Sequence, residues 1–293
     1  MSRLLTPEDR AASLIEALPY IQKFRGHTFV IKYGGAAMEE DSIVEKFLRD
    51  IVFLEAVGIN PVLVHGGGKA ITARMREAGL AARFVNGLRV TEAAAIRIVE
   101  ETLDREINPR IVETINRFGG KAVGLSGKDV FVARRLGPQP AEGGGHEDVG
   151  FVGEAAGIET AATAAAVMSE TVPVISPIGA EAGGTVLNIN ADIAAAALAS
   201  ALKAEKLVYV SDVPGIMRDP TDPESLIPAV HADDVDMLIR KKVIGGGMIP
   251  KVRSAISALQ AGVGKVHFVG GTIQHCLLLE IFSDDGIGTE ITA

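Results

Sequence analysis

Thr28-Phe29-Val30-Ile31-Lys32-Tyr33, followed by Gly34-Gly35, is the stretch that decides the fold. Its apolar run predicts a buried strand, and the two glycines end that strand in a tight turn. Similar strands are predicted at residues 62–65, 172–175, 207–210 and 266–269, and helical patterns lie between several of them. Strands that alternate with helices form βαβ units, so we expect an α/β fold whose mainly parallel sheet is covered by helices on both faces.

Other segments carry predictions of their own. Residues 6–25 are expected to form a helix that Pro19 kinks or breaks, because proline removes a backbone donor. Asn86-Gly87 predicts a β-hairpin, since both residues accept positive φ. Further helices are predicted over residues 41–57, from the Gly66-Gly67-Gly68 cluster to about residue 78, over 91–118 with an interruption near Pro109, over 235–242 and from Pro250 onward. Residues 137–145 are expected to form a loop or flap.

Composition and charge exclude several classes of function. The chain has 293 residues and a formal net charge of −8, with no basic run, which disfavours nucleic acid as a partner. Its single cysteine, Cys276, allows no internal disulfide and is expected to be a buried helical thiol. No apolar run is long enough to span a membrane, and the N-terminus resembles neither a signal nor a transit peptide. We therefore expect a cytoplasmic protein with no membrane or nucleic-acid partner.

Three glycine clusters follow a strand or open a helix. They are Gly34-Gly35, Gly66-Gly67-Gly68 and Gly245-Gly246-Gly247. Such loops let backbone N–H groups and the helix dipole face an anion. None has the spacing of a phosphate-binding P-loop or of a dinucleotide-binding loop, which disfavours a nicotinamide enzyme.

Two lysines and an aspartate complete the candidate chemistry. Lys32 ends a strand and Lys251 begins a helix; each alone is typical of an ordinary surface lysine. Asp192 lies at a strand-to-helix junction, where it can cap the helix or hold two ammonium groups in place. Phosphoryl transfer depends on fixed positive charge, so the two lysines with the glycine loops favour a phosphoryl-transfer enzyme.

An ordered set of motifs then resembles a known family. In chain order they are Lys32-Tyr33-Gly34-Gly35, His65-Gly66-Gly67-Gly68, Gly87-Leu88-Arg89-Val90-Thr91, Asn188-Ile189-Asn190-Ala191-Asp192, Ser211-Asp212-Val213-Pro214-Gly215 and Gly246-Gly247-Met248-Ile249-Pro250-Lys251. From about residue 26 onward, the chain resembles the amino acid kinase family, and within it the group that phosphorylates N-acetyl-L-glutamate. The resemblance implies a three-layer α/β/α sandwich, with an amino-acid lobe over residues 26–202 and an ATP lobe over 203–293. It also implies transfer of the ATP γ-phosphoryl group to the side-chain carboxylate, the second step of arginine biosynthesis, with Mg²⁺ held by the phosphates rather than by a protein ligand.

The same resemblance implies a role for each matching residue. Lys32 and Lys251 would bind the transferring phosphoryl group, with Asp192 orienting both. Arg89 would pair with the α-carboxylate of the substrate, and Asn188 would bind the amide side of the substrate. The remaining residues implied are Gly34, Gly35 and Gly67 at the phosphoryl group, Gly67 and Gly68 at the substrate, and Ser211, Asp212, Met217, Gly245, Gly246 and Gly247 near the nucleotide.

The resemblance extends to regulation in arginine-sensitive members. Residues 1–25 resemble the extra kinked helix that joins three dimers into a hexamer. Glu280 and the backbone near Gly286 resemble the site for the inhibitor L-arginine. In some photosynthetic organisms, members of the family bind a PII signalling protein, so a PII protein is a candidate partner of this chain.

Three other functions remain open from the sequence. The first is another acyl-phosphate-forming kinase, acting on aspartate, glutamate or carbamate; the absence of an obvious extra regulatory domain argues against aspartate kinase. The second is a non-catalytic arginine sensor, which would be expected to have lost a catalytic lysine. The third is the nicotinamide enzyme that the glycine spacing disfavours.

Overall fold

The computed structural model describes residues 6–140 and 144–293, and within them an eight-stranded sheet forms the centre of the molecule. Its strands, in spatial order, are β14 (Ala229–His231), β16 (Thr289–Thr292), β15 (Lys265–Gly270), β13 (Lys206–Ser211), β1 (Thr28–Tyr33), β2 (Asn60–His65), β10 (Val172–Ile175) and β5 (Ala122–Leu125). Within the described residues, every neighbouring pair of this sheet is parallel except β15 with β16. The predicted parallel sheet is confirmed, and it runs without a break across the expected lobe boundary near residues 200–205.

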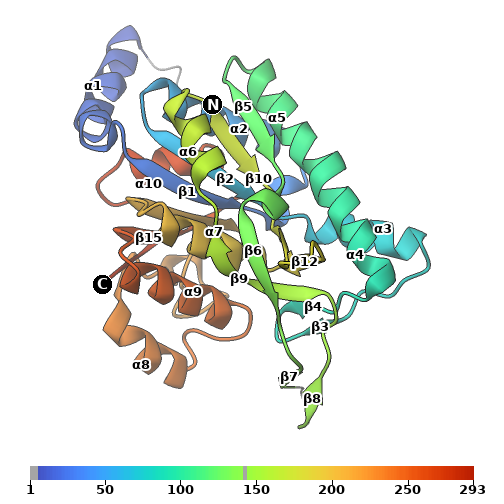
Figure 1. Cartoon of the computed structure of the whole chain (residues 1–293). Coiled ribbons are helices and arrows are strands. Elements are labelled where there is room, and N and C mark those ends of the chain that lie inside the picture. Colours follow the sequence, from blue (N-terminus) through green and yellow to red (C-terminus); the bar gives the residue numbers. More distant parts are fainter. Residues whose placement is uncertain (1–5, 141–143) are drawn as a thin grey trace.

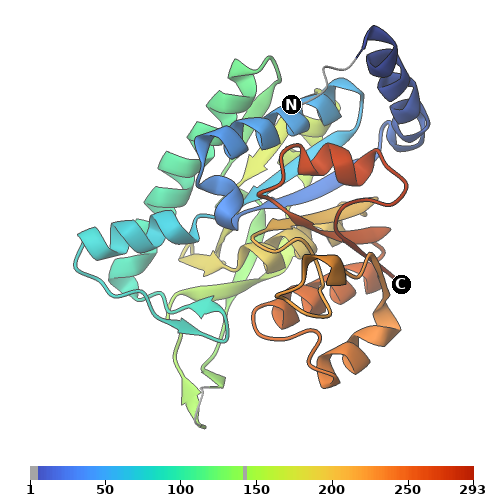
Figure 2. The same ribbon diagram turned by 180° about the vertical axis from the view of Figure 1, so that it is seen from behind.

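Helices cover both faces of this sheet, which gives the three layers (Figures 1 and 2). On one face, Val30 and Val62 pack with the Ala-rich helix α7 (Ala191–Ala201) and with α9 (Met248–Gln260). On the other face, Phe29 and Ile31 pack with α2 (Asp41–Ala56), α5 (Asn108–Arg117) and α10 (Cys276–Ile281). Strand side chains alternate between the two faces, so a nearly continuous apolar run such as β1 fills both cores.

A second, smaller set of strands was not predicted as a sheet. The strands β6 (Phe131–Arg135), β9 (Val152–Ile158), β12 (Val186–Ile189) and β11 (Ile178–Ala180) close on one another beside the main sheet. The predicted hairpin is present as β3 (Phe84–Val85) and β4 (Leu88–Arg89), with Asn86 and Gly87 both at positive φ. A short pair, β7 (Gln139–Pro140) and β8 (His146–Glu147), flanks the glycine-rich loop; part of the predicted flap, residues 141–143, lies outside the described residues.

Several predicted helices differ from the structure in detail. The first helix, α1 (Pro7–Phe24), begins at a Thr6–Asp9 capping box and continues through Pro19, so of the predicted kink or break, the break does not occur. The predicted interruption of the long helix near Pro109 is present as a change of helix type: a π-helical segment, η2 (Thr102–Ile107), joins α4 (Ala93–Glu101) to α5 without a break in the chain's helical path. Helix α9 begins at Met248, two residues before the predicted start, because proline is tolerated in a first turn.

The remaining elements connect these layers. They are α3 (Gly68–Glu77), α6 (Ala161–Met168), α8 (Val235–Arg240) and the short 3₁₀ turns η1 (Gly35–Met38), η3 (Gly127–Asp129), η4 (Pro223–Ser225) and η5 (Ala232–Asp234). Cys276 is buried at the start of α10, as predicted, and burial raises the pKa of its thiol to about 12. In the part of the chain that the structure describes, no helix combines the length and apolarity needed to cross a bilayer.

Candidate active site

Lys32, Asp192 and Lys251 meet at the ends of three different elements. Lys32 lies near the carboxyl end of β1, Asp192 in the first turn of α7, and Lys251 in the first turn of α9. The Lys32 Nζ is 3.1 Å from Asp192 Oδ1, and the Lys251 Nζ is 2.5 Å from Asp192 Oδ2. One carboxylate therefore contacts both ammonium groups, each through a different oxygen.

The local sequence explains why Asp192 faces the lysines rather than its own helix. Asn190 is the N-cap of α7, and its side-chain oxygen accepts hydrogen bonds from the Asp192 and Ile193 amides. Because Asn190 satisfies those helix donors, the Asp192 carboxylate remains available for ion pairs. Asp192 is therefore an acid of the first turn and not the N-cap, and its carboxylate contacts both ammonium groups.

The charges of these three groups depend on one another. Burial disfavours the charged form of Asp192, but Lys32 and Lys251 outweigh it and hold the carboxyl pKa below its ordinary value of 3.8. Burial lowers the pKa of Lys251, while the Asp192 carboxylate opposes that shift. Asp192 therefore helps to keep a partly desolvated lysine positively charged, next to a second cation.

The first two glycine clusters line the space beside the lysines. A Cβ on Gly34 would lie 2.7 Å from the Lys32 Nζ. Gly35 has a φ of +70°, and a Cβ on it would collide with the Asp212 carboxylate. A Cβ on Gly67 would lie 2.6 Å from Leu103 Cδ2, so a side chain there has no space. Among the described residues, no acceptor receives a hydrogen bond from the Gly67 amide. These loops bring bare backbone to the site, as the sequence predicted.

A cavity of about 250 Å³ lies on one side of the lysine pair. Arg89 forms part of its wall and donates to the Gly68 carbonyl at 2.7 Å and to Thr72 Oγ1 at 2.8 Å. Asn188 donates to Thr91 Oγ1 at 3.1 Å. The predicted residues that line this cavity are Lys32, Gly34, Gly35, Gly67, Gly68, Arg89, Asn188 and Asp192. The supporting hydroxyls of Thr72 and Thr91 were not predicted as site residues, although Thr91 stands in the recognised motif.

A larger cavity of about 480 Å³ lies on the other side of the lysine pair. Its lining includes Lys32, Gly35, Ser211, Asp212, Met217, Gly245, Gly247 and Lys251, all of them predicted. Gly246 does not line this cavity; it occupies a left-handed turn position at a φ of +51°. Ile216 and Val243 add apolar wall that the sequence reading missed. Lys32 borders both cavities, so a group transferred between them would pass the lysine pair.

The profile of the amino acid kinase family matches residues 27–270. The chain belongs to the amino acid kinase family. It is similar to the acetylglutamate kinase of Akkermansia muciniphila, at 52% identity over 284 residues that cover 97% of this chain and 95% of that protein. It is also similar to the acetylglutamate kinase of Heliobacterium modesticaldum, at 48% identity over 293 residues that cover 98% of this chain and 99% of that protein. The predicted resemblance to this family and to its acetylglutamate kinases is confirmed.

Solved structures of the amino acid kinase fold agree with this placement. The chain is similar to N-acetylglutamate synthase from Neisseria gonorrhoeae, with a TM-score of 0.83 and 28% identity over 97% of this chain; it spans 63% of the length of that protein. Carbamate kinase from Giardia lamblia, at a TM-score of 0.64 and 18% identity over 91% of this chain and 98% of that one, shares the fold. The predicted three-layer α/β architecture is confirmed.

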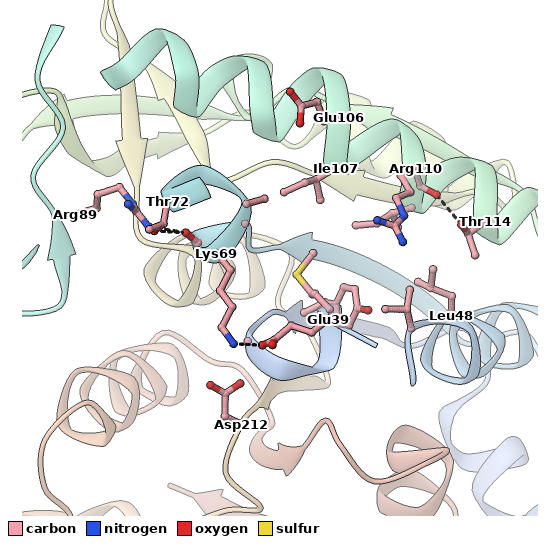
Figure 3. A pocket seen from close by; sticks show the side chains of 18 of the residues that line it. Glu39, Leu48, Lys69, Thr72, Arg89, Glu106, Ile107, Arg110, Thr114 and Asp212 are labelled. Carbon is pink, nitrogen blue, oxygen red and sulfur yellow. Dashed lines mark hydrogen bonds and ion pairs between the residues drawn. The ribbon is translucent and has the colours of Figure 1, made fainter. Parts of the chain in front are cut away.

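A third cavity, of about 510 Å³, adjoins the glycine loops of this amino acid kinase fold (Figure 3). Leu48, Ile107 and Met38 give it an apolar floor, and Glu39 pairs with Lys69 at its rim. Arg89 also lines the 250 Å³ cavity and Asp212 the 480 Å³ cavity, so this third cavity shares lining residues with both. The sequence did not predict this cavity, although the predicted site residues Gly35, Gly67, Gly68, Arg89 and Asp212 are part of its lining.

The residues expected at a second site lie together, away from the lysine pair. Glu280 and Gly286 line a cavity of about 380 Å³ that also contains Lys206, His267 and Tyr20. Lys206 begins β13, whereas Ser211, which lines the cavity of about 480 Å³, ends it. The two sites therefore lie at opposite ends of one strand.

The Glu280 carboxylate in that cavity already has protein partners. It contacts His267 Nδ1 at 2.6 Å and accepts hydrogen bonds from the Ile287 and Gly288 amides. His267 in turn contacts the Lys206 Nζ at 2.8 Å, and burial lowers the pKa of Lys206 to about 8. Lys206 and His267 were not predicted as site residues; the signal was a charged residue and a histidine within otherwise apolar strands.

Proposed function

We propose that this chain uses ATP to phosphorylate the side-chain carboxylate of N-acetyl-L-glutamate, giving N-acetyl-L-glutamyl 5-phosphate in arginine biosynthesis. The observation that supports this most directly is the meeting of Lys32 and Lys251 on Asp192 between two cavities. The similarity to acetylglutamate kinases over nearly the whole chain supports the choice of substrate.

The mechanism needs fixed charge rather than a base. The attacking carboxylate is already ionised at neutral pH, so no proton must be removed. It attacks the γ-phosphorus as the bond to the β–γ bridging oxygen breaks, and ADP leaves. Lys32 and Lys251 would neutralise the charge that spreads over the phosphoryl and leaving oxygens, while Asp192 holds both lysines in place.

The smaller cavity would hold the amino acid. Its walls come from residues 26–202, which we assign to the substrate lobe. Arg89 is anchored by Gly68 and Thr72, so its guanidinium is held ready for the α-carboxylate. Asn188 lies in the same wall and would bind the amide side of the acetylated substrate. Gly67 and Gly68 would contribute backbone donors.

The cavity of about 480 Å³ would hold the nucleotide, mainly against residues 203–293. Ser211, Asp212 and Met217 would border it on one side, and Gly245 and Gly247 on the other. The described residues include no cluster of three His, Cys, Asp or Glu side chains suited to a metal ion. We assign Mg²⁺ to the phosphates of ATP, where it would neutralise their charge.

A coupled assay of ADP release tests this function. N-acetyl-L-glutamate should support turnover, whereas L-glutamate, L-aspartate and carbamate should support at least 10²-fold less, because a site built around an amide rejects a substrate that leaves its polar groups unpaired. Preference for an unacetylated acid would assign the chain to another kinase of the family. Lys251→Met is the matched inactive control.

Regulation by L-arginine is a separate part of the proposal. The cavity at Glu280 and Gly286 combines carboxylates with the cations Lys206 and Lys265, which suits an amino acid that carries both charges. Tyr20 of α1 donates a hydrogen bond to Asp284 and packs edge-on against Phe282, so α1 closes one side of this cavity. We propose that arginine bound here inhibits the enzyme.

The exposed apolar side of α1 supports a proposal about oligomerisation. Leu14, Ile15 and Leu18 are 69%, 68% and 43% exposed, and they lie together on a helix that projects from the body (Figures 1 and 2). We propose that this surface joins dimers into a hexamer of the cytoplasmic enzyme. Replacing Leu14 and Leu18 with aspartate should leave dimers by light scattering with the cavity at Glu280 intact; unchanged hexamers would contradict the assignment.

A further inference from the structure

His65, the last residue of β2, lies directly beneath the second glycine loop and is fully buried. Its Nδ1 is 2.9 Å from the Gly66 carbonyl oxygen, and its Nε2 is 3.3 Å from the Asn108 side-chain nitrogen. A carbonyl oxygen only accepts, so Nδ1 carries the proton. The ring is then neutral, and Nε2 accepts from Asn108. Both ring nitrogens have a partner that fits this tautomer.

Asn108 fixes that tautomer from the other side. Its side-chain nitrogen also donates to the Val174 carbonyl oxygen at 2.8 Å, so both amide hydrogens point at acceptors. A protonated His65 would bring an Nε2–H against this amide group, two donors face to face. Burial also holds the pKa of His65 down, to about 4. The pair therefore stays neutral and keeps one orientation at physiological pH.

This orientation determines where the Gly67 amide points. The carbonyl of Gly66 and the N–H of Gly67 belong to one planar trans peptide, so they point in opposite directions. Because His65 holds the carbonyl toward the interior, the Gly67 N–H points away from it. Gly67 lines the cavity that also contains Lys32 and Asp192, and its amide has no acceptor among the described residues.

The π-helical segment η2 packs against the same Gly66–Gly67 peptide. Positions five apart lie about 140° apart around a regular α-helix, whereas a π-turn stacks them. At the end of η2 the backbone N–H of Asn108 donates to the Leu103 carbonyl oxygen, five residues earlier, which brings these two residues to one face of the helix. A Cβ on Gly67 would lie 2.6 Å from Leu103 Cδ2 and 2.7 Å from Ile107 Cδ1. One irregular segment therefore both packs against Gly67 and presents Asn108 to His65.

We propose that His65 and Asn108 are positioning residues that aim the Gly67 amide at the phosphoryl group during transfer. This inference rests on the proposed kinase function, because it assigns the Gly67 N–H to that group. Neither side chain touches substrate; each acts through the peptide that it orients.

Two matched variants test the proposal. In His65→Asn the side-chain amide nitrogen takes the place of Nδ1 and keeps the donor to Gly66. In His65→Gln the side-chain amide reaches the place of Nε2, where its oxygen can accept from Asn108, and the donor to Gly66 is lost. We expect His65→Gln to lower kcat by roughly 10²-fold, as for loss of one oxyanion donor, with KM for both substrates within about threefold. His65→Asn should keep kcat within about fivefold of wild type. Equal kcat in the two variants, or an effect confined to KM, would overturn the proposal. Absence of turnover by the wild type would refute the kinase function instead.

A measurement on the wild-type protein covers the case in which a variant does not fold. Nitrogen-15 NMR of the histidine rings distinguishes the two neutral tautomers and the charged form. We expect His65 to remain in the Nδ1–H tautomer, neutral, between about pH 5 and 8. The Nε2–H tautomer would show that Nδ1 does not donate to the Gly66 carbonyl, which would overturn the proposal. Protonation near the ordinary pKa of 6.5 would show that Nε2 does not accept from Asn108, which would remove Asn108 as a positioning residue.

Discussion

Replacing Asp192 with asparagine keeps the shape of the side chain and removes the charge that both lysines contact. The side chains of Lys32, Lys251 and Asp192 are 10%, 20% and 14% exposed, so water replaces little of the lost interaction. Breaking a buried ion pair by removing one partner costs about 3–5 kcal/mol. We expect Asp192→Asn to lower the free energy of unfolding by about 3 kcal/mol at pH 7, and to lower kcat by at least 10²-fold because the lysines lose their position.

Urea denaturation and the coupled kinase assay measure both effects. The control is a double-mutant cycle with Lys251→Met, which removes one of the two cations left unpaired. The double variant should be more stable than the sum of the single changes by at least about 1 kcal/mol, yet remain inactive. If Asp192→Asn lies within about 0.5 kcal/mol of wild type, or if the two changes are additive, Asp192 does not hold the lysines together.

The pH dependence of this difference has a defined sign. The folded-state pKa of Asp192 lies below 3.8, so its contribution to stability is fully present above the unfolded-state value. That contribution is lost as the pH falls through the folded-state pKa. The stability gap between wild type and Asp192→Asn should therefore be constant near neutral pH and close in acid.

Three further predictions concern other groups. Arg89→Lys keeps the charge but loses the planar fork, so KM for N-acetyl-L-glutamate should rise roughly 10- to 10²-fold with kcat little changed, measured by steady-state kinetics; an unchanged KM would remove Arg89 from the substrate site. Glu280→Gln should weaken inhibition by L-arginine at least tenfold without changing the uninhibited rate, and an unchanged inhibition curve would place the effector elsewhere. His65 is neutral when folded, with a pKa of about 4 against 6.5, so between these values the unfolded chain binds the extra proton. Wild type should lose up to about 3 kcal/mol more than His65→Asn as the pH falls through that range, and equal acid sensitivity would contradict the buried neutral ring.

Much of the fold is predictable because its information is local. The apolar run of β1 and the glycines that follow it specify a buried strand and a tight turn without reference to distant residues. The Asn86-Gly87 hairpin is predictable for the same reason. In contrast, β9 contains the sequence Val-Gly-Glu-Ala-Ala-Gly-Ile, which favours a strand weakly and becomes one by pairing with β6.

The candidate site divides along the same line. Lys32, Asp192 and Lys251 stand in recognisable motifs, but their contact depends on how β1, α7 and α9 meet in space. The π-helical segment, whose Leu103 and Ile107 side chains lie against Gly67 in the structure, was not predicted from the sequence. Lys206 and His267 stand out as polar residues in apolar strands, but only the fold places them beside Glu280.

Trapping of the product by hydroxylamine tests the central claim most directly. An acyl phosphate reacts with hydroxylamine to give a hydroxamate, so this product distinguishes transfer to a carboxylate from hydrolysis of ATP. With ATP, Mg²⁺ and N-acetyl-L-glutamate, we predict one hydroxamate for each ADP released, and loss of both products in Lys251→Met. ADP release without hydroxamate, or equal amounts of hydroxamate in wild type and Lys251→Met, would contradict phosphoryl transfer by the lysine pair.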